Sequence, residues 1–256
     1  MTSRTVLLTG ATGGIGRSTA QALIAAGHRV ILNGRHEAAL QALAAALGTQ
    51  AEYITADITH AEDRARIARM ARDKGVNTVI NNAGISHFGL LDDCNAIESQ
   101  ITTNLLAPIL LTQALLPAFK ALPEACIINI GSTLGSIGYP GYAAYCASKF
   151  GLRGFTEALA RELADTAIRV QYIAPRATDT DINSAAVRAL NAELGSQADS
   201  PEAVAAIIVD ALTSGAACTY IGWPEKLFVR MNALLPNIVA GSLKKQLPII
   251  KRHARP

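Results

Sequence analysis

The chain has 256 residues, half of them apolar and 17% charged, with a formal net charge of +3. This length fits one α/β domain, and the charge content lies below the roughly 25% typical of soluble domains. Outside the last 34 residues nothing is basic enough to follow a phosphate backbone, so we expect no nucleic-acid partner.

The cysteine pattern and the start of the chain indicate the compartment. The four cysteines show neither CxxC spacing nor histidines at ligand intervals, so we expect reduced thiols and no metal site: Cys94, Cys126, Cys146 and Cys218. The chain opens on a strand-like segment, and we expect no signal peptide and no apolar run of the roughly 20 residues that a spanning helix needs. These features predict a cytoplasmic protein.

A glycine-rich loop stands between two strand-like segments near the N-terminus. Residues 6–8 are an apolar run that leads into TGATGGIG at 9–16, a helix-patterned segment ends at Gly27, and residues 30–32 are a second apolar run. In this context glycines allow a tight turn and a close approach to a pyrophosphate, which the N-terminus of the helix attracts. The segment therefore predicts a dinucleotide site.

The end of the second strand indicates which dinucleotide is bound. It reads Asn33-Gly34-Arg35-His36, with no carboxylate before Glu37. The missing acid removes repulsion of a 2′-phosphate, and the Arg35 guanidinium suits a phosphate. We therefore favour NADP(H). NAD(H) is the alternative, because Arg35 could be only a solvated arginine and Gly13 stands where a basic residue often gives a second phosphate contact.

Helical and strand-like segments alternate along the rest of the chain. We expect helices at 37–47, 63–73, 95–119 and from Tyr145 to about 163, and strands at 52–54, 79–80, 126–130, 170–174 and 219–221. With the first two strands, this alternation predicts one doubly wound α/β domain with a seven-stranded parallel sheet, covering residues 1–222. Ligands are expected beyond the carboxyl ends of the strands.

A phenol, an ammonium and a hydroxyl lie in the segments INIGST and YCASK. Tyr145 and Lys149 are four residues apart and therefore neighbours on one helix face. A close cation can lower a tyrosine pKa from about 10 by roughly 1–3 units, which would let Tyr145 exchange a proton with a carbonyl or an alcohol near neutral pH. Ser132, thirteen residues upstream, could point at the same substrate oxygen.

These motifs together resemble the short-chain dehydrogenase/reductase family over residues 5–222. The matching segments are TGATGGIG at 9–16, Asp57 in ADIT, NNAG at 81–84, Asn104 in TTNLLAP, Ser132, and YCASK at 145–149. The resemblance implies a Rossmann-type, NADP(H)-binding catalytic domain and an oxidoreductase that acts on a carbonyl or a secondary alcohol. It also implies a homodimer or homotetramer, as does the apolar composition. The alternatives are a 3-oxoacyl reductase acting on carrier-bound chains and a non-catalytic nucleotide sensor.

The resemblance also assigns roles to single residues. It implies that Tyr145 is the general acid/base and Lys149 its activator, that Ser132 orients the substrate oxygen, and that Asn104 interrupts its helix to hold a relay water. It places Asp57 near the adenine, with a helix cap as the alternative. The residues implied in cofactor binding are Thr9, Gly10, Gly14, Ile15, Gly16, Arg35, Asp57, Ile58, Asn81, Ala83, Gly84, Tyr145, Lys149, Pro175, Thr178 and Thr180.

One segment departs from the family pattern. Arg176 follows Pro175 where the family commonly has glycine, which puts the local backbone conformation in doubt. Arg176 is interpreted either as a phosphate or substrate contact or as a solvated side chain. Residues 176–200, with a short helix at 185–194, are interpreted as a mobile lid or as an ordinary surface loop. We expect Leu134, Ile137, Tyr139 and 87–88 to shape the substrate pocket.

Residues 223–256 lie beyond the family pattern. They hold four lysines, three arginines and one histidine against Glu225 alone, a formal charge of +6. Apolar residues recur at helical spacing, and we expect Pro236 and Pro248 to interrupt the pattern and leave short helices. This basic amphipathic extension predicts either packing on the protein, over the active-site mouth or against another subunit, or peripheral membrane contact.

Overall fold

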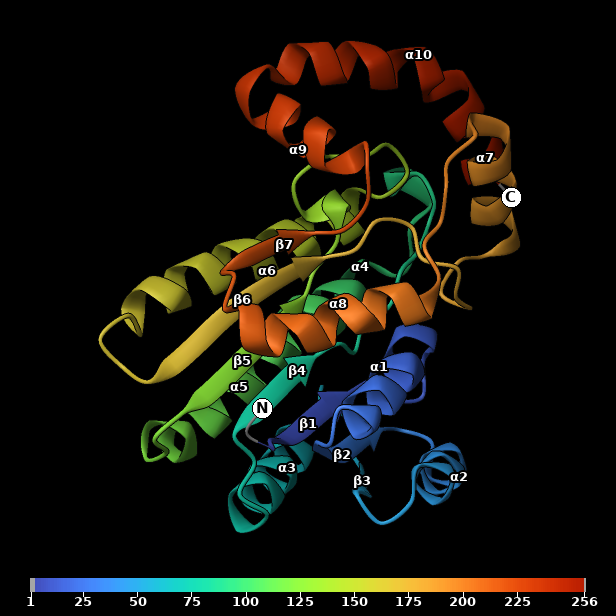
Figure 1. Cartoon of the computed structure of the whole chain (residues 1–256). Coiled ribbons are helices and arrows are strands. Elements are labelled where there is room, and N and C mark those ends of the chain that lie inside the picture. The colour runs from blue at the N-terminus through green and yellow to red at the C-terminus, as the bar shows by residue number, and fades with distance from the viewer. Residues whose placement is uncertain (1–2, 256) are drawn as a thin grey trace.

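Seven parallel strands form one sheet in the computed structural model, which describes residues 3–255 (Figure 1). The sheet order is β3-β2-β1-β4-β5-β6-β7. The order runs outward from the β1–β4 pair in both directions, so the predicted doubly wound arrangement is confirmed. The strands are β1 Thr5–Thr9, β2 Arg29–Gly34, β3 Ala51–Thr55, β4 Thr78–Asn81, β5 Ala125–Ile130, β6 Ile168–Ala174 and β7 Cys218–Tyr220.

Helices cover both faces of the sheet and enclose two apolar cores. One core lies under α1 (Gly14–Ala25), α2 (Glu37–Leu47) and α8 (Pro201–Ser214). The other lies under α3 (Ala61–Asp73), α5 (Ala107–Lys120) and α6 (Ala143–Glu162). Because both faces are covered, the central strands are mostly apolar, and all of β4 and β5 is buried, including the polar Thr78, Asn81 and Asn129.

Helix α8 is missing from the elements predicted from the sequence. Its start and end carry clear signals, since the Ser200 hydroxyl accepts a hydrogen bond from the amide of Ala203, Pro201 stands at the first position, and Gly215 is left-handed. Its Val204 and Ile208 are fully buried in the core that α1 also covers. The predicted elements resume only at the last strand.

The predicted long helix at 95–119 is three pieces. Helix α4 (Ile97–Ile101) leads through a π-helical turn (Thr102–Leu106) into α5. Contrary to the sequence expectation, Ile97–Lys120 is long and apolar enough to cross a membrane by length and composition. Three of its side chains, Leu111, Leu115 and Phe119, are buried in the core, so packing against the sheet accounts for part of its apolar character.

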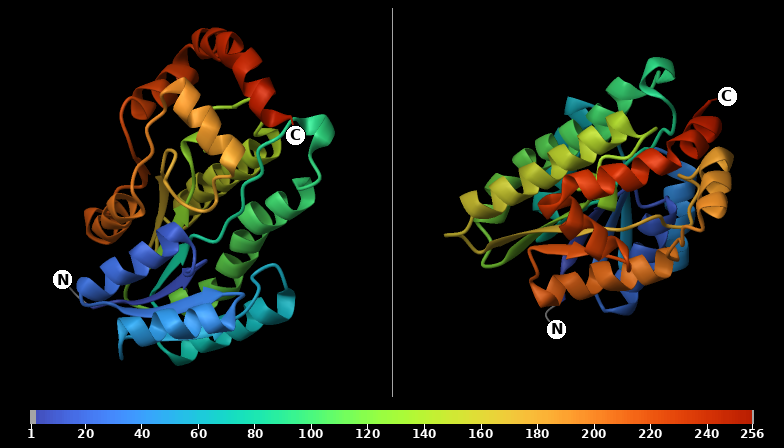
Figure 2. Two further views of the ribbon diagram at one scale, coloured as in Figure 1. Left: turned by 90° about the vertical axis from the view of Figure 1, so that its right-hand side faces the viewer. Right: turned by 90° about the horizontal axis from the view of Figure 1, so that it is seen from above.

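Residues 225–254 form two helices above the carboxyl edge of the sheet. Helix α9 (Glu225–Leu234) turns into α10 (Pro236–Ala254), which packs beside α7 (Ala185–Leu194) (Figures 1 and 2). The expected interruption at Pro236 is present, because this proline begins α10. The interruption expected at Pro248 is wrong. Pro248 lies inside α10, where one missing N–H donor does not end a helix held by packing on both sides.

Candidate active site

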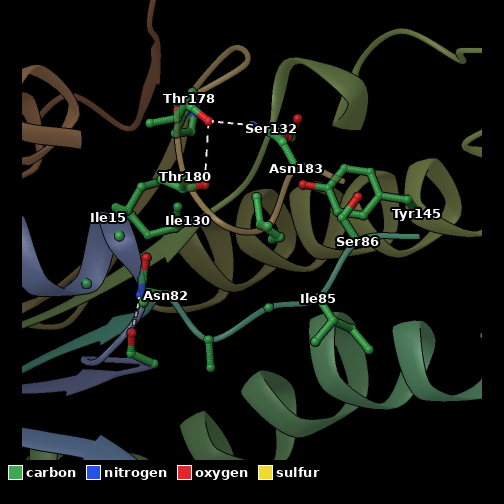
Figure 3. Close-up of a pocket in the computed structure, with 18 of the residues that line it drawn as sticks. Ile15, Asn82, Ile85, Ser86, Ile130, Ser132, Tyr145, Thr178, Thr180 and Asn183 are labelled. Atoms are coloured by element: carbon green, nitrogen blue, oxygen red, sulfur yellow. Dashed lines mark hydrogen bonds between the residues drawn. The ribbon is translucent and has the colours of Figure 1, made fainter. Parts of the chain in front are cut away.

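A cavity of about 630 Å³ opens at the carboxyl edge of the sheet. Its wall is made by the glycine loop, the segments that follow β2, β3, β4, β5 and β6, and helix α7 (Figure 3). Parallel strands bring these segments together because all their carboxyl ends lie at one edge. Most of the predicted site residues line this cavity: Gly10, Gly14, Ile15, Gly16, Arg35, Asp57, Ile58, Ala83, Gly84, Ser132, Tyr145, Lys149, Pro175, Thr178 and Thr180.

The turn after β1 is locked to the segment after β4. Gly10 has a φ of +64°, and a Cβ there would lie 2.7 Å from the Cα of Ala83. Thr9 does not line the cavity. Its hydroxyl is buried and accepts from the amides of Asn82 and Ala83, both at 3.0 Å. Asn82, which the sequence analysis missed, lines the cavity and donates to the carbonyls of Thr9 and Gly10 at 3.0 and 3.1 Å.

The beginning of α1 fits a dinucleotide phosphate. Its first amide groups have no partner within the helix and, with Gly14 to Gly16, they face the cavity. A Cβ at Gly14 would lie 2.5 Å from Cγ2 of Thr180, so only glycine lets the segment after β6 approach the helix. Arg35 lines the same cavity at the end of β2, with an exposed side chain.

Asp57 lies in the cavity wall and does not cap a helix. Its carboxylate accepts from the amide and the hydroxyl of Thr59 at 2.9 and 2.7 Å, and helix α3 begins later, at Ala61. Burial raises the pKa of Asp57, but the bonds from Thr59 and the nearby Arg35 outweigh it, so the pKa lies below its usual value. The carboxylate is therefore ionised at neutral pH.

Tyr145 and Ser132 lie at the floor of the cavity (Figure 3), which Lys149 also lines. Helix α6 carries Tyr145 and Lys149, and Ser132 follows β5. The Lys149 ammonium is buried. It donates to the carbonyl of Ile130 at 2.9 Å and lies 5.8 Å from the centre of the Tyr145 ring.

The predicted lowering of the Tyr145 pKa is wrong in this structure. Burial raises the pKa of Tyr145 to about 12, and the Ser132 side chain only partly opposes it. Burial also lowers the pKa of Lys149, to about 8. Both shifts have one cause, because a low-dielectric site disfavours the phenolate and the ammonium alike. The phenol is therefore a neutral proton donor across the physiological pH range.

Two predicted site residues, Asn81 and Asn104, lie behind the cavity wall. Asn104 is fully buried in the π-helical turn and clamps the segment after β4, accepting from the Ile85 amide and donating to its carbonyl, both at 2.8 Å. It also donates to the Ser148 hydroxyl at 3.2 Å. Asn81 donates to the Asn129 side chain at 2.8 Å. Asn104 therefore positions backbone, whereas Asn81 joins β4 to side chains of β5 and α5.

Arg176 is neither a solvated side chain nor strained. No residue other than glycine has a positive φ in the described chain, so replacing glycine costs no backbone strain here. Its guanidinium makes two bonds to Asp199, at 2.7 and 3.0 Å, and contacts Glu225 at 3.3 Å and the Trp223 carbonyl at 3.1 Å. Arg176 thus joins the end of β6 to the far end of the lid and to the start of α9.

Aromatic and aliphatic side chains line the substrate side of the cavity. Tyr139 and Tyr142 line it with Leu134, while Phe88 packs on Tyr142 with ring centres 5.0 Å apart. Tyr142 was missed by the sequence analysis, although it precedes Tyr145 by one helical turn. Helix α7 closes this side with Val187 and Leu190. The predicted Ile137 and 87–88 do not line the cavity.

The comparisons agree with this geometry. The family model for short chain dehydrogenases matches residues 4–191. Nodulation protein G of Rhizobium sp. (strain N33) is 37% identical over 180 residues, which are 68% of this chain and 73% of that protein. The 3-oxoacyl-(acyl-carrier-protein) reductase of Escherichia coli (strain K12) is 36% identical over 186 residues, 70% of this chain and 75% of that protein.

A solved structure extends the likeness over most of the chain. A short-chain dehydrogenase from Sphingobium yanoikuyae, in complex with NADPH, has a TM-score of 0.78 and 29% identity, and covers 94% of this chain and 95% of that one. Fold, site and comparisons together define a Rossmann-type oxidoreductase. The chain belongs to the short-chain dehydrogenase family.

Proposed function

We propose that the chain reduces a ketone or aldehyde with NADPH and, in reverse, oxidises the matching alcohol with NADP⁺, a secondary alcohol where the carbonyl is a ketone. The observation that carries this proposal is the shared cavity: a phenol and a hydroxyl face the same space that the glycine loop lines. A non-catalytic sensor would not require Tyr145, Ser132 and Lys149 at one cavity floor.

The residues of this chain would move the proton while the cofactor supplies the hydride. A nicotinamide bound in this cavity would supply the hydride for the carbonyl carbon. Ser132 would hold the carbonyl oxygen, and Tyr145, whose pKa of about 12 keeps its proton in place, would donate that proton to the oxygen. The buried Lys149 cation would stabilise the phenolate left behind, and the water that we propose Asn104 holds would return the proton.

The proposed preference for NADP(H) rests on Arg35. Its guanidinium lines the cavity next to Asp57, and no carboxylate follows β2 before Glu37. The Sphingobium yanoikuyae relative was solved with NADPH, which supports the same choice. The pyrophosphate would bind the first amides of α1, and Pro175, Thr178 and Thr180 would border the nicotinamide half.

The proposed substrate carries an apolar group next to its carbonyl. The apolar and aromatic part of the cavity lining includes Leu134, Tyr139, Tyr142, Val187 and Leu190. Arg176, which also lines the cavity, is paired with the carboxylates of Asp199 and Glu225. A 3-oxoacyl chain would fit this lining too, and the Escherichia coli relative is named for that reaction. Carrier-bound acyl chains are therefore the second candidate substrate.

Two further features of the assembly are proposed. We propose that 1–222 is the catalytic unit and that 223–256 is an extension covering it. We also propose a homodimer or homotetramer, because the exposed side chains of Ile97, Leu106 and Phe150 lie on packed neighbouring segments, α4, the π-helical turn and α6. Light scattering of the purified chain tests the assembly, and a monomer would contradict it.

The replacement Tyr145→Phe tests the proposed chemistry. It should reduce ketone turnover by about 10² to 10⁴-fold, the usual contribution of a positioned acid, while NADPH affinity changes less than about threefold. Tyr142→Phe is the matched control, because it keeps the ring one turn away and should retain most of the turnover. Full turnover in Tyr145→Phe would remove Tyr145 as the acid.

A further inference from the structure

The helix pair α9–α10 has an exposed apolar surface that the rest of the chain does not cover. Eleven large apolar side chains are notably exposed in the described residues, and six of them lie within 223–238. Their exposed fractions run from 42% to 79%: Trp223 68%, Leu227 42%, Phe228 42%, Leu234 79%, Leu235 53% and Ile238 55%. We call this set the apex patch.

Internal packing of the tail uses other residues. Val229, Val239 and Ile250 are buried, and the Asn232 amide donates to the carbonyl of Ser136 at 2.9 Å. At the far end of α10, Arg252 and His253 pair with Glu193 of α7. The tail is thus already docked on the protein by one face, so the apex patch is a second apolar face that this docking leaves in solvent.

Exposed cations lie along the same two helices as the apex patch, and acids are nearly absent from residues 223–255. Six basic side chains of the tail are exposed and, within residues 3–255, form no ion pair: Lys226, Arg230, Lys244, Lys245, Lys251 and Arg255. Glu225, the one acid of 223–256, is used by Arg176. An exposed apolar surface mixed with unpaired cations is complementary to a bilayer that carries anionic headgroups.

We infer that the tail docks the protein on an anionic bilayer, with the apex patch in the interface and the lysines at the headgroups. The exposed Trp223 fits this placement, because tryptophan prefers the boundary between hydrocarbon and water. The tail stands above the carboxyl edge of the sheet, where the cavity opens (Figure 1). Docking would therefore hold the cavity mouth close to the membrane, which would deliver an apolar substrate from the lipid phase.

The single tryptophan makes the inference directly measurable. Trp223 is the only tryptophan of the chain, so its emission reports on the apex patch alone. The full chain is mixed with vesicles of phosphatidylcholine and with vesicles that also contain phosphatidylglycerol. Flotation and a blue shift of the Trp223 emission are expected with the anionic vesicles, and both should weaken as salt is added.

Two double variants separate the apolar and the cationic contributions. Leu234→Ser with Leu235→Ser should weaken binding on the order of tenfold for each leucine. Lys244→Gln with Lys245→Gln should weaken it about fivefold for each lysine. The matched controls alter side chains exposed elsewhere, Leu91→Ser for the apolar change and Arg72→Gln with Arg161→Gln for the charge change, and should bind like the wild type.

Three outcomes would overturn the inference. One is absence of flotation with anionic vesicles, and another is equal loss of binding in variants and controls. The third is a fall in oligomer mass in the Leu234→Ser, Leu235→Ser variant without vesicle binding by the wild type, which would show that the apex patch is a contact between copies. None of these readouts depends on turnover, so the test stands whether or not the proposed reaction is right.

Discussion

The floor of the cavity and its cover are held by different interactions. The floor, with Tyr145, Ser132 and Lys149, adjoins the turns after β1 and β4, which are joined by buried contacts to backbone: the Thr9 hydroxyl accepts from two backbone amides, and Gly10 lies close to Ala83. The cover, residues 176–200 and 223–254, is held together by side-chain ion pairs, since Arg176 pairs with Asp199 within the first segment and with Glu225 of the second. Backbone contacts fix a geometry within tenths of an ångström, whereas ion pairs near the surface can open and close. The floor is therefore suited to chemistry and the cover to admission of ligands.

Removing the buried Lys149 cation from the floor should lower the turnover of the enzyme and raise its free energy of unfolding. Lys149→Met replaces an ammonium that makes one hydrogen bond and whose pKa burial lowers to about 8. Turnover should fall on the order of 10² to 10⁴-fold. The free energy of unfolding at pH 7 should rise by on the order of 2 kcal/mol, because a desolvated charge is replaced by an apolar chain.

Steady-state kinetics and urea unfolding check both halves of this expectation. Lys149→Arg is the control that keeps the charge. It should fail to gain stability, because the larger cation is buried in the same place. A Lys149→Met protein that is less stable than the wild type would show that the ammonium stabilises the floor. That result would contradict the distinction between a floor without stabilising charges and a cover held by ion pairs.

The glycine loop should tolerate no side chain where it packs on itself. A Cβ at Gly16 would overlap the carbonyl oxygen of Gly10 and lie 2.9 Å from the Cα of Ala11, both of them backbone atoms. Gly16→Ala should therefore weaken NADPH binding on the order of tenfold to a hundredfold, measured by calorimetry. Gly154→Ala is the matched control, since no atom lies within 4 Å of its Cβ, and it should stabilise α6 by about 0.5–1 kcal/mol.

The two regions also differ in how far the sequence predicts them. The floor is predictable because its motifs are local, so that TGATGGIG, NNAG and YCASK each mark a strand end or a helix face. The partners of Arg176 are not, because Asp199 and Glu225 lie 23 and 49 residues away along the chain. Nothing in sequence spacing indicates those contacts.

Burial explains the main error at the site itself. Spacing correctly made Tyr145 and Lys149 neighbours, but the direction of the Tyr145 pKa depends on desolvation by the whole fold. The same limit applies to Pro248, whose helix persists because of packing that no local rule describes. Helix α8 is a different kind of error, since its capping residues were readable in the sequence.

The cover should loosen when its central ion pair is removed. Arg176 is 12% exposed and paired with two carboxylates, so Arg176→Ala leaves Asp199 and Glu225 without their partner. The KM for the ketone should rise on the order of tenfold, while kcat and NADPH affinity change less than about threefold, if the cover governs admission alone. Arg161→Ala, at an 80% exposed side chain, is the matched control.

Limited proteolysis gives a readout that does not depend on the reaction. Residues 177–200 should be cleaved faster in Arg176→Ala than in the wild type, because their far end is released. An equal loss of kcat and of NADPH affinity in this variant would show that floor and cover act as one unit.

The smallest effect expected is a pH dependence of kcat that is caused by Lys149 in the floor and not by the cover. The Lys149 pKa is lowered to about 8, so its proton is lost as pH rises through that value, while the Tyr145 pKa of about 12 keeps the phenol neutral. The kcat for ketone reduction should be half its plateau near pH 8 and about tenfold lower one unit above. The Arg176 pKa is raised by its bonds to Asp199, so the cover stays tied over this range.

Stability should move the opposite way over the same range. In the unfolded chain Lys149 regains the ordinary lysine pKa of 10.5, so between about 8 and 10.5 the unfolded chain binds more protons and the free energy of unfolding rises with pH. If kcat falls above pH 8 while the free energy of unfolding does not fall, the loss of activity comes from deprotonation of Lys149 and not from denaturation. Arg176→Ala should show the same fall in kcat with pH. A shifted midpoint of the pH profile in that variant would mean that the cover influences the pKa of Lys149.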